Sequence, residues 1–270
     1  WREGFECNSN FDGKYRTDGY EGAIVLNPFT GLYIKSPTAV GDYAGLYPSA
    51  MISENICLSS KVFTKFYDTN NRFLYSIGDK NSDGEFTYDN IPGKEYVDIK
   101  SNTYKYVKVA GNIKDKKIPT GHRICRFAQY PNGEKAVLPS ILSELIKARK
   151  DTRKMIPKQT DEFMKNILDK RQKAIKVVAN SVYGQTGAKT STFYDMDIAA
   201  STTAVGKMLL IYAKDIIENC FDNTIVNTSF GPIRTKAKYV YGDTDSVFFN
   251  MNLHTVDTNK PFEGNESLPM

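Results

Sequence analysis

Three carboxylates stand beside apolar stretches, where acidic residues are uncommon. Asp243 and Asp245 flank Thr244 in "YGDTDS" (241–246), between the apolar segments "KYVY" and "SVFF". Asp and Gly form turns readily, so an ordinary acidic turn is one interpretation. The apolar flanks indicate instead a turn held by two buried strands. Carboxylates on such a rigid support suit a hard divalent cation such as Mg²⁺, which prefers oxygen ligands and phosphate partners.

The third acid, Asp42, ends "TAVGD" (38–42), which is predicted to be a strand. If this strand neighbours the acidic hairpin, Asp42 meets Asp243 and Asp245 at one sheet edge. The three acids would then make a site for two metal ions, which can activate an attacking oxygen and stabilise a leaving phosphate oxygen. This arrangement requires that the helices between the two stretches be inserted between two halves of one sheet.

The segment "YAGLYPS" (43–49) reverses the chain and opens a helix with Pro48 in its first turn. Free backbone N–H groups in such a turn, those of Gly45 and Leu46 among them, can cradle a triphosphate. Tyr47 would stand beside that nucleotide. Taken alone, Tyr47 is better explained as a packing residue.

A cationic group follows on two predicted helices. In "SILSELIKARKDTRK" (140–154), with Ser140 as its expected N-cap, Arg149 and Arg153 continue the aliphatic stripe of Leu142 and Ile146. This continuation favours inward-pointing arginines, although a solvated basic face is the usual explanation of such residues. The helix breaks at a proline in "MIPKQ" (155–159), so an antiparallel helix pair is expected.

The second helix is "TDEFMKNILDKRQKAIKVVANSVYG" (160–184). Its residues Lys176, Asn180 and Tyr183 share one face because they are spaced by four and three positions. A cationic cluster opposite a carboxylate cluster is what binding a metal-complexed triphosphate requires. Tyr183 and Gly184 would offer a flat ring and a close backbone approach, suited to stacking under a base pair.

The overall composition is less specific. The chain has 270 residues, is 40% hydrophobic and carries a net charge of +5, which fits either a polyanionic partner or surplus surface lysine. The four cysteines are far apart and are expected to be free thiols in a reducing compartment. The two histidines lie in no ligand or triad pattern, which argues against histidine-based catalysis. No apolar run approaches membrane-spanning length, so no membrane partner is expected.

Three stretches, in this order, resemble motifs A, B and C of family B DNA polymerases: "DYAGLYPS" (42–49), "KVVANSVYG" (176–184) and "YGDTDS" (241–246). In addition, "GYEGAIVLNPFTGLY" (19–33) resembles the segment that joins the exonuclease and polymerase modules. "LPSILSELIKARKDTRK" (138–154) resembles the first fingers helix. The resemblance covers roughly residues 19–250 and is weak over 60–135. It is nearest to delta-like enzymes and to the polymerases of large DNA viruses.

The resemblance implies an α+β fold: a right-hand polymerase palm, an antiparallel sheet with packed helices, and an inserted α-helical fingers hairpin. The implied divisions are a connector from an upstream exonuclease-side region (1–19), the first part of the palm (20–136) with an irregular β insertion (60–120), the fingers helix pair (137–192), the second part of the palm (193–255) and a truncated tail (256–270). The initial Trp1 and the tail indicate a piece of a longer protein.

The resemblance also implies roles. Asp42 and Asp245 would be the catalytic metal ligands, with Asp243 in support and the carbonyl of Tyr43 completing a metal shell. Tyr47 would be the steric gate that rejects a ribose 2′-OH. The groups that would hold the triphosphate are Gly45, Leu46, Arg149, Arg153, Lys176 and Asn180. Tyr183 and Gly184 would pack against the nascent base pair, and the DNA contacts would be Tyr20, Gly22, Ala23 and Thr244. The family usually has Ser where this chain has Gly45, so a more flexible turn is expected.

The expected function is template-directed transfer of dNTPs to a primer 3′ end with two Mg²⁺ ions. The implied partners are primer–template DNA, dNTPs and a sliding clamp bound through missing regions; the implied setting is intracellular, in the host nucleus or a cytoplasmic viral replication site. Without exonuclease acids before residue 20 or a thumb motif after residue 255, the piece alone is expected to be inactive or weakly active. The alternatives are a palm-type RNA polymerase or reverse transcriptase, disfavoured by Tyr47 and "NSVYG", and a catalytically incomplete DNA- or nucleotide-binding fragment.

Overall fold

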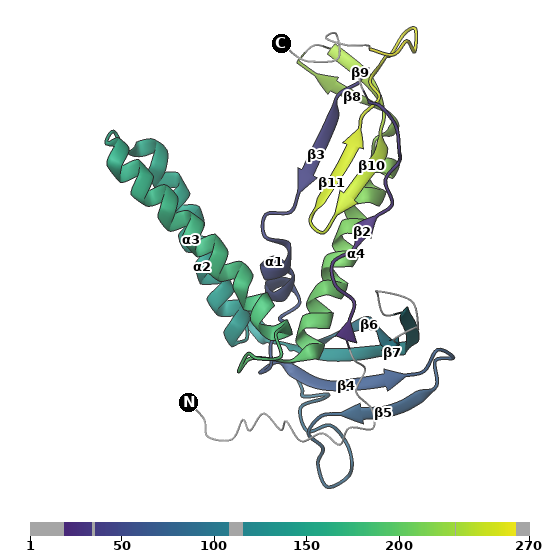
Figure 1. Cartoon of the computed structure of the whole chain (residues 1–270), viewed down its shortest axis with the longest axis vertical. Helices are drawn as coiled ribbons and strands as arrows, with labels where there is room; N and C mark the ends of the chain where they lie inside the picture. The colour runs from purple at the N-terminus through teal and green to yellow at the C-terminus, as the bar shows by residue number, and fades with distance from the viewer. Residues whose placement is uncertain (1–18, 34–35, 108–115, 230, 263–270) are drawn as a thin grey trace.

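The computed structural model describes residues 19–33, 36–107, 116–229 and 231–262. It is a mixed α+β protein whose sheets are antiparallel (Figure 1). Residues 1–18 of the predicted connector and residues 263–270 of the predicted tail lie outside the described residues.

The largest sheet has five strands in the order β1-β6-β7-β4-β5. They are β1 (Gly19–Tyr20), β4 (Lys61–Tyr67), β5 (Phe73–Ile77), β6 (Glu95–Val107) and β7 (Lys116–Gln129). Strands β6 and β7 pair from Glu95↔Gln129 to Val107↔Lys116. Within the predicted irregular β insertion at 60–120, residues 61–67, 73–77, 95–107 and 116–120 are strands, and residues 78–94 are mostly turns and bends. Strand β7 continues beyond residue 120. The polar residues that suggested irregularity alternate with apolar ones along half-buried strands.

A second sheet has four strands in the order β2-β10-β11-β3. They are β2 (Val25–Leu26), β3 (Thr38–Asp42), β10 (Lys238–Asp243) and β11 (Ser246–Asn250). The expected acidic hairpin is thus confirmed as β10–β11, and β3 lies along β11. A small third sheet, β12-β9-β8, contains β8 (Asp222–Thr228), β9 (Gly231–Lys236) and β12 (His254–Thr255).

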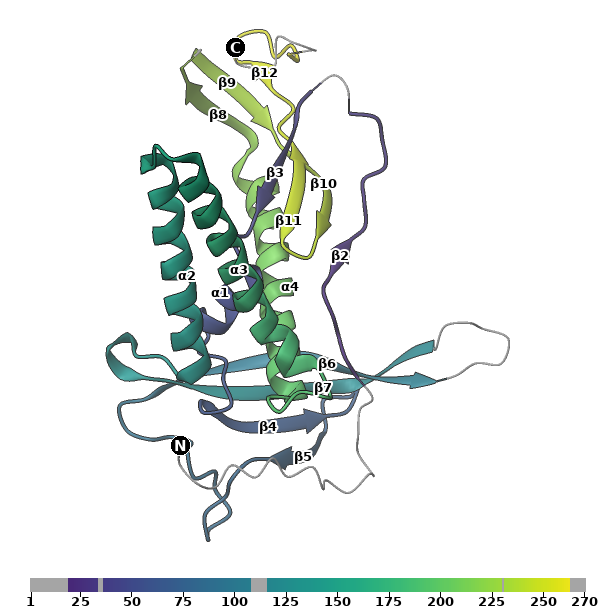
Figure 2. The same ribbon diagram turned by 60° about the vertical axis from the view of Figure 1, so that its left-hand side comes forward.

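Helices α2 (Val137–Met155) and α3 (Glu162–Gly187) form the expected hairpin, joined by the short 3₁₀ segment η2 (Ile156–Lys158) (Figure 2). Another 3₁₀ turn, η1 (Pro131–Gly133), precedes α2. The prediction of Ser140 as N-cap was wrong: Ala136 holds that position, and the Ser140 hydroxyl donates to the carbonyl of Lys135. The predicted helix began after Pro139, but a proline is tolerated within the first turn of a helix, and α2 begins two residues earlier, at Val137.

Helix α4 (Met196–Cys220) joins the two large sheets. Its first half buries Ile198 and Val205 in the main core, whereas Leu210 belongs to a second cluster with Tyr239 and Val247 beneath the acidic hairpin. Helix α1 (Leu46–Ser53) packs against α4 and brings the segment after Asp42 into the same core. Burial of α4 therefore fixes the acidic strand ends relative to the five-stranded sheet.

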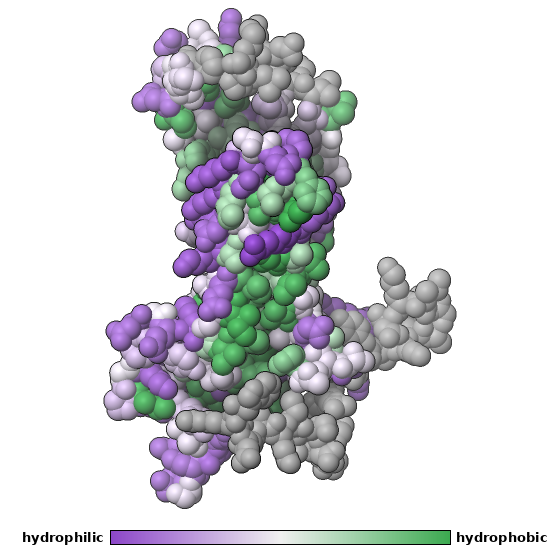
Figure 3. All heavy atoms as spheres, turned by 90° about the vertical axis from the view of Figure 1, so that its left-hand side faces the viewer, coloured by the Kyte–Doolittle hydropathy of each residue, from purple (hydrophilic) through white to green (hydrophobic). Residues whose placement is uncertain are grey.

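The surface of the helical hairpin changes along its length. Figure 3 shows hydrophilic side chains around its tip and a continuous apolar area below, towards the five-stranded sheet. The hairpin's exposed apolar side chains include Val137, Ile141, Val177 and Val178. Within the described ranges, no helix has both the length and the apolar character needed to cross a membrane.

Candidate active site

The structure brings the predicted carboxylates together. Asp42, the last residue of β3, lies opposite Ser246 at the start of β11. The backbone N–H of Tyr43 donates to the carbonyl of Asp245 at 2.8 Å. Asp243 ends β10, so carboxylates from distant parts of the chain meet at one end of the four-stranded sheet. The expected neighbourhood of Asp42 and the acidic hairpin is confirmed.

The turn between the two hairpin aspartates is under backbone strain. Thr244 has φ 56°, a left-handed conformation that a β-branched residue rarely adopts. The turn is held by an Asp245 N–H bond to the Asp243 carbonyl at 2.6 Å and a Thr244 N–H bond to the Ile24 carbonyl at 2.9 Å. Strain of this kind persists only where the surroundings impose it, and it clusters at functional sites.

The electrostatics of the acids favour a cation. The pKa of Asp245 is raised, first by burial and then by the negative charges of Asp42 and Asp243, while Lys176 opposes the shift. Like charges held this close disfavour joint ionisation, and a divalent cation relieves the conflict. Asp42, Asp245 and the Tyr43 carbonyl offer only oxygen donors, which fits Mg²⁺.

Asp243 is less available than the other two acids. Its Oδ1 accepts a bond from the Thr244 hydroxyl at 2.9 Å, and its Oδ2 accepts a longer one from the Tyr241 hydroxyl at 3.4 Å. No group of three or more His, Cys, Asp or Glu side chains within the described part of the chain is arranged to hold a metal ion. The two hydrogen bonds of Asp243 are compatible with the predicted supporting position of this residue, which stays a prediction.

The backbone N–H of Gly45 was expected to be free, but the structure shows it hydrogen-bonded. Gly45 is the N-cap of α1 with φ 79° and ψ 64°, a left-handed conformation that glycine adopts without strain. Its N–H donates to the Tyr43 carbonyl at 2.7 Å, so the prediction that this N–H is free was wrong. The groups without an intrahelical acceptor are the N–H groups of the next two residues, Leu46 and Tyr47, in the first turn of α1.

Tyr47 and Tyr183 stack, with ring centroids 4.3 Å apart and 28° between the planes. The pKa of Tyr47 is raised by burial and, next, by the charge of Asp245. A Cβ at Gly206 of α4 would lie 3.0 Å from Cε1 of the Tyr47 ring, so the ring also rests closely on α4. Burial raises the pKa of Tyr183, and a hydrogen bond with Tyr20 raises it further. Three of the predicted tyrosines thus meet beside the acids.

The segment after Tyr20 is held by α4. The Thr203 hydroxyl donates to the Glu21 carbonyl at 2.8 Å, and the Glu21 side chain pairs with Lys117 and Lys207. The predicted DNA-contact residues Gly22 and Ala23 follow and are exposed. Gly184 on α3 is exposed too, and a Cβ there would meet nothing within 4 Å, which leaves its backbone open to a ligand.

The predicted basic residues divide into two groups. Lys176 and Asn180 are exposed on the inner half of α3, and the charge of Lys176 acts on Asp245. Arg149 is half-buried, and its Nε donates to Oε1 of Gln172 at 3.2 Å. Arg153 is exposed in the last turn of α2, and its predicted inward direction stays a prediction.

The distance along the helix explains the difference. In Figure 1 the hairpin leans away from β3 and β11 towards its tip. Arg149 and Arg153 belong to the last two turns of α2, the end that leads into the η2 connection. Neither arginine forms an ion pair with a described carboxylate, and the main packing partner of α2 is α3.

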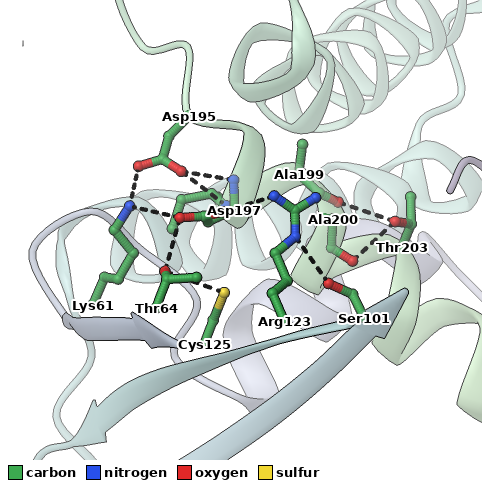
Figure 4. Close-up of polar contacts among 11 residues, drawn as sticks. Lys61, Thr64, Ser101, Arg123, Cys125, Asp195, Asp197, Ala199, Ala200 and Thr203 are labelled. Carbon is green, nitrogen blue, oxygen red and sulfur yellow. Dashed lines mark hydrogen bonds and ion pairs between the residues drawn. The ribbon is translucent and has the colours of Figure 1, made fainter. Parts of the chain in front are cut away.

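Sequence reasoning missed a second charged group, which we call the buried ion cluster: Lys61, Arg123, Asp195 and Asp197 (Figure 4). It joins β4 and β7 to the start of α4. The available signals were Arg123 within an otherwise alternating strand and the two acids flanking Met196 ahead of an apolar helix.

Fold and site together describe a mixed α+β protein whose sheet end gathers three aspartates beside stacked tyrosines. Residues 7–263 match the model of DNA polymerase family B. A DNA polymerase of Phaeocystis pouchetii virus is 54% identical over 88% of this chain. A DNA polymerase delta catalytic subunit of Schizosaccharomyces pombe is 31% identical, also over 88% of this chain.

A solved family B DNA polymerase of the archaeon Pyrobaculum calidifontis matches 87% of this chain and 23% of its own, at 24% identity and a TM-score of 0.46. The chain belongs to DNA polymerase family B, because the family model spans most of its length. It covers 23% of the viral relative and 17% of the fission-yeast relative.

Proposed function

We propose that this chain supplies the nucleotidyl-transfer core of a DNA-directed DNA polymerase, which adds dNTPs to a primer 3′ end under the direction of a template. The observation that carries the proposal is the pairing of β3 with β11, which sets Asp42 beside the acidic hairpin. Family membership supports it. The activity is proposed for the complete polymerase, since the relatives are several times longer than this chain.

The architecture suits a palm with inserted fingers. The palm would comprise the two large sheets and α4, and the fingers would be the α2–α3 hairpin within residues 137–192. In this assignment the hairpin would be inserted between the two halves of the palm, which agrees with the order of the elements along the chain. We further propose that the complete protein is a delta-like polymerase of a large DNA virus, which the viral relative and the fission-yeast delta catalytic subunit support.

In this proposal Asp42 and Asp245 hold two Mg²⁺ ions with help from the Tyr43 carbonyl. When bound, such ions lower the pKa of an attacking hydroxyl and neutralise charge on the phosphates. Lys176, Asn180 and the free N–H groups of α1 bind the triphosphate by charge and hydrogen bonds. Arg149 and Arg153 reach it only through a movement of the hairpin towards the strands.

Tyr47 would select the sugar. Its ring is held between Tyr183 and Gly206, next to the carboxylates, so it has little freedom to withdraw from a 2′-OH. Tyr183 and Gly184 would face the nascent base pair, and the DNA contacts would come from Tyr20, Gly22, Ala23 and Thr244. Primer–template DNA and dNTPs are the proposed partners, together with a sliding clamp bound through other parts of the polymerase.

Primer extension by the complete polymerase tests the proposal. Asp245→Asn should lower the rate at least ~10³-fold, because several kcal/mol of charge stabilisation are lost and each 1.36 kcal/mol is tenfold in rate. Asp222→Asn is the matched control, an exposed aspartate at the start of β8. Equal extension by wild type and Asp245→Asn would exclude the proposed metal role.

A further inference from the structure

Buried polar groups tie both ends of the α2–α3 hairpin to other elements. Before α2, the fully buried Asn55 donates from Nδ2 to the carbonyl of Ala128 on β7, at 2.8 Å. Its Oδ1 accepts the N–H of Ala136, the N-cap of α2, also at 2.8 Å. After α3, the N–H of Asp195 donates to the carbonyl of the buried Thr186 at 2.9 Å. The hairpin therefore has two anchored roots.

One carboxylate joins three elements at the second root. Asp195 forms an ion pair with Lys61 at the start of β4 (Figure 4). Its other oxygen, Oδ1, accepts the N–H groups of Asp197 at 2.8 Å and Ile198 at 3.2 Å, which caps α4. Its backbone N–H holds the last turn of α3. Loss of Lys61 would thus loosen the residue that aligns α3 with α4 and the five-stranded sheet.

The pair is charged and partly shielded from water. The side chain of Lys61 is 22% exposed and that of Asp195 is 14% exposed. Burial alone would lower the pKa of Lys61, but the carboxylates of Asp197 and Asp195 more than offset burial and raise it above its ordinary value. Lys61 therefore stays protonated at any pH at which a polymerase works, and the pair is screened by solvent less than a surface pair.

Helix α3 connects the second root, at Thr186 and Asp195, to the candidate active site. The Thr186 hydroxyl donates to the Tyr183 carbonyl at 2.7 Å, and Tyr183 stacks on Tyr47. Lys176 lies ten residues before Thr186, which is about 15 Å along an α-helix. A tilt of roughly 4° at the root would then move Lys176 by about 1 Å, a displacement that can cost two orders of magnitude in rate.

We propose that Lys61 and Asp195 form a positioning pair that sets the direction of α3, and hence the approach of Lys176 and Asn180 to a nucleotide at Asp42 and Asp245. The inference rests on the proposed nucleotidyl transfer. Neither residue of the pair touches the acids; each acts through α3. Asp197 pairs with Arg123 at 2.8 Å and, at 3.6 Å, with Lys61 as well. It is not part of the positioning pair, because it holds the start of α4, whereas the backbone N–H of Asp195 bonds to α3.

Single-nucleotide incorporation by the complete polymerase tests the pair. Lys61→Met keeps the apolar stem and removes the charge; we expect KM for dNTP to rise about tenfold or more, with primer–template affinity within twofold of wild type. Lys61→Arg keeps the charge and should stay within about threefold. Asp195→Asn keeps the cap acceptor and weakens the ion pair, so it gives a second variant with the same direction of change.

Arg126→Met is the matched control. Arg126 lies on β7 of the same sheet, two residues before Ala128, and its side chain is 25% exposed. It pairs with Asp98 at 2.6 Å and Asp89 at 3.1 Å, neither of which belongs to a root of the hairpin. It should leave KM for dNTP unchanged. The inference is overturned if Lys61→Met and Asp195→Asn leave KM unchanged, or if Arg126→Met raises it as much as they do.

A structural readout separates this inference from the proposed activity. Spin labels on unnatural amino acids at Lys158, between α2 and α3, and at Asp222 report the hairpin's position without nucleotide or catalysis. We expect Lys61→Met to broaden the distance distribution and Arg126→Met to leave it as in wild type. Failure of wild type to extend a primer would refute the proposed function alone, whereas an unchanged distribution in Lys61→Met would refute the positioning pair.

Discussion

The acidic strand ends and the buried ion cluster gather charged side chains in opposite ways. At the strand ends, Asp42 and Asp243 add to the burial that raises the pKa of Asp245. In the ion cluster, burial would raise the pKa of Asp197, but Lys61 and Arg123 outweigh it and lower the pKa. Buried charges that are paired with opposite charges stabilise the fold. Like charges held close together are instead typical of functional sites, where a bound ligand of opposite charge neutralises them. The comparison thus contrasts a cluster whose charges hold elements together with a candidate site whose charges call for a ligand.

The largest expected difference concerns stability. Asp197→Asn leaves the fully buried Arg123 without its counter-charge and should destabilise the N-terminal half of α4 by about 3 kcal/mol. Asp245→Asn removes like-charge repulsion and should leave the β10–β11 hairpin as stable as before, or more so. Native-state hydrogen exchange of the complete polymerase measures both. If Asp245→Asn destabilised the β10–β11 hairpin, the claim that like charges repel one another at the acidic strand ends would be wrong.

The lowered pKa of Asp197 also predicts how stability depends on pH. Because the pKa of Asp197 is lowered from 3.8 in the folded protein, its stabilising contribution is present above that value and lost as pH falls through the lowered pKa. The stability gap between wild type and Asp197→Asn should therefore be constant near neutral pH and narrow in acid. Hydrogen exchange or thermal unfolding at a series of pH values measures this gap. A gap that widens in acid would contradict the assigned pairing.

Tyr47 tests the functional side of the comparison. Replacement by Ala removes the ring that Tyr183 and Gly206 hold in place, so discrimination against ribonucleotides should fall roughly tenfold to a hundredfold. The ratio of kcat/KM for a dNTP and the matching ribonucleotide measures it. Tyr75→Ala, on β5 of the five-stranded sheet, is the control. Unchanged selectivity in Tyr47→Ala would favour a packing role instead.

The smallest effect is expected at Gly45. A serine there must adopt a left-handed conformation, which costs about 1–2 kcal/mol locally, although a Cβ would meet no atom within 4 Å. We expect dNTP affinity to change less than about threefold, because the Gly45 N–H is already bonded to Tyr43. Nucleotide titration of Gly45→Ser in the complete polymerase measures the affinity. A large loss of incorporation would show that this turn contributes more than its backbone.

The site was predictable where local patterns sufficed. The apolar flanks of Asp243 and Asp245 indicate strands, and a carboxylate after a predicted strand places Asp42 at a sheet edge. The adjacency of the two was an inference about pairing, and β3–β11 confirms it. By contrast, the periodic stripe through Arg149 and Arg153 predicts that they lie on one face of a helix, but it does not predict which element packs against that helix. The main packing partner of α2 is α3.

The ion cluster shows why the rest was out of reach. Lys61 and Asp195 are 134 residues apart, and each is an ordinary polar residue in its local context. Their pairing depends on how β4 meets the start of α4, which no local period encodes. The order of the five-stranded sheet has a similar origin, since the long pairing of β6 with β7 follows from tertiary contacts rather than from a local pattern.

The most direct test of the central claim is the position of bound metal. Crystals of the complete polymerase with primer–template, a dNTP and Mn²⁺ in place of Mg²⁺ would locate the ions by anomalous scattering. The account predicts ions about 2.1 Å from carboxylate oxygens of both Asp42 and Asp245. Ions bound without either carboxylate, or side chains too far apart to share them, would contradict it.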